Sequence, residues 1–86
     1  MPDIVMYCTE ICPFCDRAEK LLVKKGVKFK KLLIDTNKDL FEEMKNKAGS
    51  DTVPQIFINE LHVGGFDELV ELDIDDELDP LLGISE

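Results

Sequence analysis

The sequence lacks the features that would place it in a membrane or outside the cell. No apolar run approaches the roughly 18 residues that a membrane-spanning helix needs, and no Lys or Arg precedes an apolar stretch near the start. We therefore expect neither a transmembrane helix nor a signal peptide. The 3 cysteines and 1 histidine fit neither a secreted disulfide framework nor a four-ligand zinc site. The expected location is cytoplasmic, where thiols stay reduced.

Basic residues are missing from both ends of the chain. All 10 Lys and Arg lie between Arg17 and Lys47, whereas the segment after Ile58 has 10 Asp and Glu and no Lys or Arg. A nucleic-acid ligand needs a basic footprint to neutralise phosphates, so we expect no nucleic-acid binding for this chain of net charge −9. The acidic third either keeps a small protein soluble or contributes to partner choice, and charge alone does not decide between these.

The length and the hydrophobic pattern predict one small α/β domain. With 86 residues and 44% hydrophobic content, the chain can form one core, and we expect residues 1–86 to be a single domain. Alternation and helical spacing predict, in chain order, a strand over 3–8, a helix over 13–25, a strand over 28–34, a helix over 38–48, strands over 55–58 and 61–63, and a helix over 67–72, with at most one or two turns within 74–82.

Local signals support the ends of these elements. Gly26 and Gly49 follow the first two helices, where a left-handed stop is common, and Asn37 offers an N-cap oxygen. Asn59 and Glu60 alone separate the last two strands, which predicts a tight hairpin. The order β-α-β-α-β-β-α therefore predicts a parallel strand pair joined by a right-handed crossover, followed by an antiparallel hairpin.

The most informative motif is Cys12-Pro13-Phe14-Cys15, between the first strand and the first helix. Proline suits a first helical turn, which places Cys12 at or next to the N-cap, where free N–H groups stabilise a thiolate. We expect Cys12 to be the exposed attacking thiol and Cys15 to be more buried, with a higher pKa, and to resolve mixed disulfides. The alternatives for the motif are half of a metal site or two structural cysteines, but partner ligands are missing.

Three separated motifs carry a resemblance to a known family. The order and spacing of these motifs resemble those of a glutaredoxin. The motifs are Tyr7 with Cys12-Pro13-Phe14-Cys15, then Thr52-Val53-Pro54-Gln55, and then Gly64-Gly65-Phe66-Asp67. This resemblance covers nearly the whole chain. It implies a thioredoxin-like fold, a three-layer α/β/α arrangement with a four-stranded mixed sheet. It also implies a redox-active disulfide between Cys12 and Cys15, with glutathione as reducing cosubstrate and no bound cofactor or metal.

The resemblance also implies a glutathione site. In the family, the proline matching Pro54 is cis, the backbone at Val53 pairs with the cysteinyl part of glutathione, and Asp67 binds its amine while helix-start N–H groups bind its carboxylate. The implied glutathione-binding residues are Phe14, Thr52, Val53, Pro54, Gly65, Phe66 and Asp67. Taken singly, these segments also fit an ordinary strand start, a capped turn and a core aromatic.

The chain departs from the family pattern at three places. Phe14 stands where tyrosine is common in the family. Thr9 stands where lysine is common, and the next residue, Glu10, adds a negative charge. Ser50-Asp51 stands where relatives often have an arginine. We therefore predict weaker stabilisation of the Cys12 thiolate and weaker glutathione binding than is typical of the family. Lys38 or Lys47 is the expected substitute cation.

The resemblance predicts an enzyme, a monomeric dithiol glutaredoxin. Its implied substrates are disulfide-containing and glutathionylated proteins, ribonucleotide reductase among them. One alternative is a glutaredoxin-like hydrogen donor reduced by thioredoxin reductase, which the Gly64 to Asp67 turn disfavours. The other is a non-enzymatic iron-sulfur carrier, which Pro13 disfavours because it stiffens the loop that must open to a cluster.

Two further residues, Cys8 and His62, lie outside these motifs. Cys8, the third cysteine, is expected to be a small buried residue, with a regulatory or intermolecular disulfide as the alternative. His62 is expected to be a hydrogen-bonded hairpin side chain, and neither a metal ligand nor a catalytic base.

Overall fold

The structure, a computed structural model, describes residues 2–84 and contains a four-stranded mixed sheet. The strand order is β2-β1-β3-β4, in which β1 pairs parallel with β2 and antiparallel with β3, and β3 pairs antiparallel with β4. The strands are β1 (Ile4–Cys8), β2 (Lys30–Leu33), β3 (Gln55–Ile58) and β4 (Leu61–Gly64). This is the predicted parallel pair followed by a hairpin.

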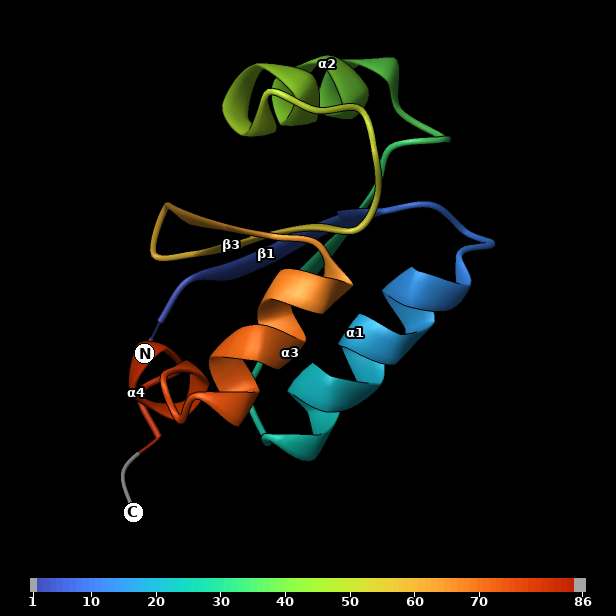
Figure 1. The fold of residues 1–86 in the computed structure, drawn as a ribbon. Coiled ribbons are helices and arrows are strands. Elements are labelled where there is room, and N and C mark those ends of the chain that lie inside the picture. Colours follow the sequence, from blue (N-terminus) through green and yellow to red (C-terminus); the bar gives the residue numbers. More distant parts are fainter. Residues whose placement is uncertain (1, 85–86) are drawn as a thin grey trace.

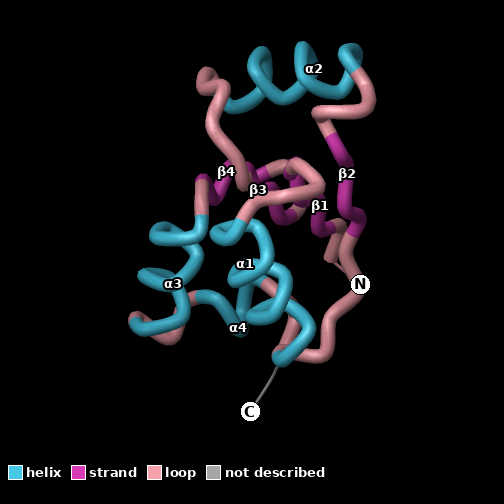
Figure 2. Tube along the Cα trace, turned by 90° about the vertical axis from the view of Figure 1, so that its right-hand side faces the viewer, coloured by secondary structure: helices cyan, strands magenta, loops and turns pink. Residues whose placement is uncertain are grey.

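Helices cover both faces of the sheet. Figure 1 shows α2 above the sheet and α1 and α3 below it, and Figure 2 shows the same layers from the side. The helices are α1 (Pro13–Lys24), α2 (Lys38–Ala48), α3 (Phe66–Ile74) and the single turn α4 (Leu78–Leu81). The three-layer α/β/α arrangement is therefore confirmed. No helix in the described part of the chain is long and apolar enough to cross a bilayer.

Several predicted boundaries were wrong by one to two residues. The strand predicted over 28–34 is shorter, because Phe29 packs against the core without pairing in the sheet. The first strand begins at Ile4, since the Asp3 N–H bonds the Asn59 side chain instead, at 2.9 Å. The helix predicted over 67–72 starts one residue earlier and ends two residues later. Its start is fixed by Glu68, whose side chain accepts a hydrogen bond from the Gly65 N–H.

The alternation of β1 distributes its side chains between two cores. Ile4, Met6 and Cys8 belong to the cluster on the α1 and α3 side, whereas Tyr7 packs with Met44 of α2 on the other side. Each of these β1 side chains is at most 2% exposed. The strand that leads into the cysteine motif is therefore fixed from both faces, which positions the loop after Cys8.

The tight hairpin between β3 and β4 is also confirmed. Asn59 and Glu60 have φ values of 50° and 70°, the left-handed pair of a type I′ turn. This connection brings β4 back along β3, so that Gly64 and Gly65 arrive beside the segment that precedes β3. The hairpin thus brings together two motifs that are about ten residues apart in the sequence.

One lysine links three helices at the end of the molecule away from the cysteines. The Lys25 ammonium lies 2.7 Å from Asp73 and 2.8 Å from Asp79, which raises its pKa to about 12. Two acids of the acidic third therefore help to join α1 to α3 and α4.

Candidate functional site

Cys12 is the N-cap of α1. Its backbone is extended, with φ −154° and ψ 103°, and its Sγ accepts a hydrogen bond from the Cys15 N–H at 3.2 Å. Pro13 occupies the first helical position, where no backbone donor is needed. The preceding loop is held by the Thr9 hydroxyl, which donates to the Ile11 carbonyl at 3.3 Å. Cys12 therefore faces the positive end of a 12-residue helix, where a thiolate is stabilised.

The prediction of an exposed Cys12 was wrong in degree. Cys12 is 8% exposed, against 2% for Cys15, so the expected order holds, but the thiol expected to attack is recessed. The reason is the capping bond, which turns the sulfur back over the first turn. Ile11 and Phe14, 91% and 52% exposed, stand out around it instead.

The pKa of the Cys15 thiol lies above its ordinary value. Burial, followed by the side-chain hydrogen bond with Cys12, raises the pKa of Cys15 to about 12, and the Thr9 backbone opposes the shift only in part. Cys15 therefore stays protonated at neutral pH, whereas Cys12 has the helix N-terminus in front of it. Both cysteines are free in this structure, which corresponds to the dithiol form.

A surface pocket of about 190 Å³ lies beside the cysteine motif. It is lined by Phe14, Thr52, Val53, Pro54, Gln55, Gly65, Phe66, Asp67 and Glu68. All seven residues that the resemblance assigned to glutathione binding are among them. The structure thus brings together three motifs from separate parts of the sequence. Gln55 and Glu68 also line the pocket but were not predicted to belong to the site. A glutamine in an otherwise apolar strand was the available signal for Gln55.

Backbone geometry shapes the two walls of this pocket. The Val53-Pro54 peptide bond is cis, as the resemblance implied, and Phe14 packs against Phe66 with ring centroids 6.4 Å apart. Gly64 has a φ of 115°, and a Cβ there would lie 2.7 Å from the Glu68 Oε1, so this turn requires glycine.

The start of α3 is partly occupied by its own cap. The Gly65 N–H donates to Glu68 Oε1 at 3.1 Å. The N–H groups of Phe66, Asp67 and Glu68, the first three residues of α3, can still receive a ligand carboxylate. The Asp67 side chain is exposed at the mouth of the pocket, where it can meet an ammonium group.

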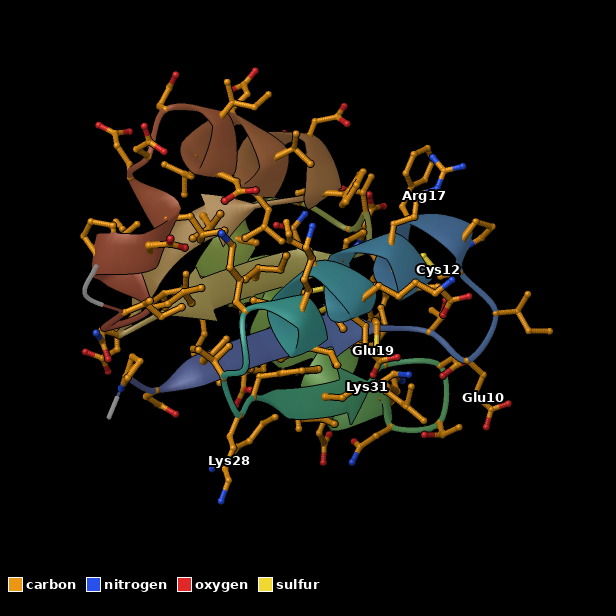
Figure 3. All side chains as sticks on the ribbon, turned by 90° about the horizontal axis from the view of Figure 1, so that it is seen from below. Glu10, Cys12, Arg17, Glu19, Lys28 and Lys31 are labelled. Carbon is orange, nitrogen blue, oxygen red and sulfur yellow. The ribbon has the colours of Figure 1, made fainter. Side chains whose placement is uncertain are left out.

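Neither lysine expected as the substitute cation lines the pocket beside the cysteine motif, and Arg17 does not line it either. Lys47 lines a different pocket, with Tyr7 and His62, and Lys38 lines neither. Arg17 instead places its guanidinium carbon 5.5 Å from the Phe14 ring centroid, one helical turn along α1. Figure 3 shows Arg17 on the same end of α1 as Cys12, while the Glu10 side chain points away from it. The spacing of three residues from Phe14 was the available signal.

Cys8 and His62 are both held by packing or hydrogen bonds outside the pocket. Cys8 is fully buried, and burial raises the pKa of its thiol although Lys31 opposes the shift. His62 stacks on Phe57, with centroids 4.9 Å apart, and bonds Gln55 at 2.7 Å, so the prediction of a hydrogen-bonded hairpin side chain is confirmed. Within residues 2–84 no group of three or more Cys, His, Asp or Glu side chains is arranged to hold a metal ion.

Comparison with known proteins agrees with this geometry. The family model described as "Glutaredoxin" matches residues 4–63. Over 82 residues the chain is 50% identical to a glutaredoxin of Pseudomonas aeruginosa, covering 95% of this chain and 98% of the relative. It is equally similar to glutaredoxin 3 of Escherichia coli, with 95% and 99% covered. A buckwheat glutaredoxin solved in complex with glutathione superposes with a TM-score of 0.88 at 27% identity, over 98% of this chain and 83% of that one.

Proposed function

The chain belongs to the glutaredoxin family of thiol-disulfide oxidoreductases, and we propose that glutathione is its reductant and that glutathionylated and disulfide-containing proteins are its substrates. One observation carries the proposal most directly. The residues expected to bind glutathione line one pocket, and this pocket adjoins the turn whose N-cap is Cys12.

In the proposed reaction Cys12 is the nucleophile. Its thiolate attacks the glutathione sulfur of a mixed disulfide, the old S–S bond breaks, and the substrate leaves as a thiolate that takes a proton from water. A second glutathione thiolate then attacks the Cys12–glutathione bond and releases glutathione disulfide. With a protein disulfide as substrate, the Cys12 thiolate attacks one sulfur, the S–S bond breaks, and the other sulfur leaves as a thiolate that takes a proton from water. Cys15 then attacks the Cys12 sulfur of this mixed disulfide, and its proton passes to the second substrate sulfur as that sulfur leaves, which closes the Cys12–Cys15 disulfide. Two glutathione molecules then reduce that bond.

We assign the pocket residues by their chemistry. The backbone of Val53 pairs with the cysteinyl part of glutathione as an added strand. Asp67 meets the ammonium group of the γ-glutamyl end, and the free N–H groups at the start of α3 meet its carboxylate. Phe14 and Phe66 form an apolar wall beside the cysteinyl residue of the tripeptide.

Arg17 is proposed to supply the positive charge for the second carboxylate of glutathione. We expect Arg17→Gln to raise KM for a glutathione mixed disulfide roughly 3- to 10-fold with kcat unchanged, because a partly solvated charge contact is worth about 1 kcal/mol. Steady-state kinetics measures this split. Lys47→Gln is the matched control, since it removes the same charge at the other pocket. Equal effects of the two variants would count against a direct contact and favour a general charge effect.

A comparison of reductants tests the function itself. We expect turnover of a small glutathione mixed disulfide with glutathione, glutathione reductase and NADPH, and little with thioredoxin reductase and NADPH. The reverse preference would replace our proposal with the hydrogen-donor alternative. A coloured, iron-containing protein after anaerobic purification would favour the iron-sulfur carrier.

A further inference from the structure

Apart from tyrosine and cysteine, Gln55 is the only residue with a polar side chain that is buried within residues 2–84, with 4% of its surface exposed. It begins β3, directly after Pro54, and its amide makes three hydrogen bonds. Its Nε2 donates to the Thr52 carbonyl at 3.0 Å and to Thr52 Oγ1 at 3.1 Å, while its Oε1 lies 2.7 Å from His62 Nε2. A buried amide that is fully satisfied holds its partners in fixed positions.

The orientation of this amide follows from its partners. The Thr52 carbonyl can only accept, so the group facing it must be the NH₂ of Gln55. The Gln55 Oε1 therefore faces His62, and because that oxygen can only accept, His62 must carry its proton on Nε2. A neutral His62 is then the Nε2–H tautomer. In this row of hydrogen bonds, His62 donates to Gln55 and Gln55 donates to Thr52.

The two ends of this chain lie at different places on the molecule. Thr52 lines the proposed glutathione pocket, where Ser50 also holds it by a 3.0 Å contact between the two hydroxyl groups. His62 lies on β4 and lines a second pocket of about 310 Å³ that Lys47 at the end of α2 also lines. His62 itself is held flat against Phe57. The hydrogen bonds therefore join Thr52, in the proposed glutathione pocket, to His62, which lies outside that pocket.

We propose that His62 and Gln55 are positioning residues for substrate recognition, which fix the Thr52-Val53 backbone in the geometry that pairs with glutathione. This inference rests on the proposed function. Without the His62 donor, the Gln55 oxygen is buried without a partner, and the amide must turn to find one, which releases the Thr52 carbonyl. The loss falls on substrate binding and leaves the sulfur chemistry at Cys12 intact.

The informative variant is His62→Phe, which keeps a ring to stack on Phe57 but removes the donor. We expect its KM for a glutathione mixed disulfide to rise roughly 5- to 10-fold, the worth of about one hydrogen bond, with kcat and the rate of Cys12 alkylation by iodoacetamide unchanged. His62→Gln, which restores an N–H donor, should recover part of the loss. Leu61→Ala is the control, an exposed side chain on the same strand.

The outcomes separate this inference from the proposed function. Unchanged KM in His62→Phe overturns the positioning role, as does a joint loss of kcat, alkylation rate and stability, which would indicate a structural role only. If the wild type has no glutathione-dependent turnover, the proposed function fails. NMR then judges the network alone: the His62 ring should be the Nε2–H tautomer, and His62→Phe should shift the amide signals of Thr52 and Val53. Unshifted signals would refute it.

Discussion

Cys12→Ser should reduce turnover of a glutathione mixed disulfide to the uncatalysed level, while the protein remains folded. A serine hydroxyl is not ionised near neutral pH, so the nucleophile is lost completely. The fold should survive because serine is among the preferred N-cap residues and can accept the bond that Cys12 Sγ now accepts from the Cys15 N–H. The coupled glutathione reductase assay measures the activity, and urea unfolding checks the stability.

Cys15→Ser is the matched variant, three residues away on the same helix turn. It removes the resolving thiol but leaves the nucleophile, so deglutathionylation should persist whereas reduction of a protein disulfide should fail. A Cys12→Ser enzyme with substantial turnover would contradict the assignment of roles. So would a Cys15→Ser enzyme that is inactive on the glutathione mixed disulfide although its thiolate at Cys12 still reacts with iodoacetamide.

Much of the fold could be predicted from the sequence because its signals are local. Asn37 caps α2 through bonds from the N–H groups of Asp39 and Leu40, and Gly49 ends it in the left-handed conformation, both as the residue types indicate. The same holds for Cys12 as N-cap and for the Asn59-Glu60 turn. In each case a few neighbouring residues determine the geometry.

The parts that could not be predicted depend on where long side chains end. The sequence allows either Lys47 or Arg17 to reach the cysteine motif. Only the packed structure shows that Arg17 lies over the Phe14 ring and that Lys47 lines a different pocket. The link between Gln55 and His62 depends on the pairing of β3 with β4, which sets two residues seven positions apart against each other. The recessed position of Cys12 depends on the rotation of one side chain.

Alkaline pH should destabilise the reduced protein, and Cys15 is a main cause. Its pKa is raised from 9.0 to about 12 in the folded state. Below pH 9 the thiol is protonated in both states and contributes no pH dependence; between pH 9 and pH 12 only the unfolded chain releases the proton. The unfolded state therefore gains, and the free energy of unfolding falls by up to about 1.4 kcal/mol per pH unit for this one proton.

Two other buried groups change stability in the same direction. The pKa of Tyr7 is raised by burial and by its 2.6 Å hydrogen bond to Glu43, and that of Cys8 is raised by burial. The decline should therefore steepen above pH 10, the ordinary pKa of tyrosine, as the Tyr7 hydroxyl starts to ionise in the unfolded chain.

Urea unfolding of the reduced protein at a series of alkaline pH values measures this decline, and Cys15→Ala isolates the thiol. Between pH 9 and pH 12 the free energy of unfolding of the variant should fall less steeply with pH than that of the wild type, by the contribution of about one proton, whatever its stability at neutral pH. Tyr7→Phe is the matched control, since it should flatten the curve only above pH 10. Parallel curves for the wild type and Cys15→Ala would mean that Cys15 ionises as easily in the fold as in the unfolded chain.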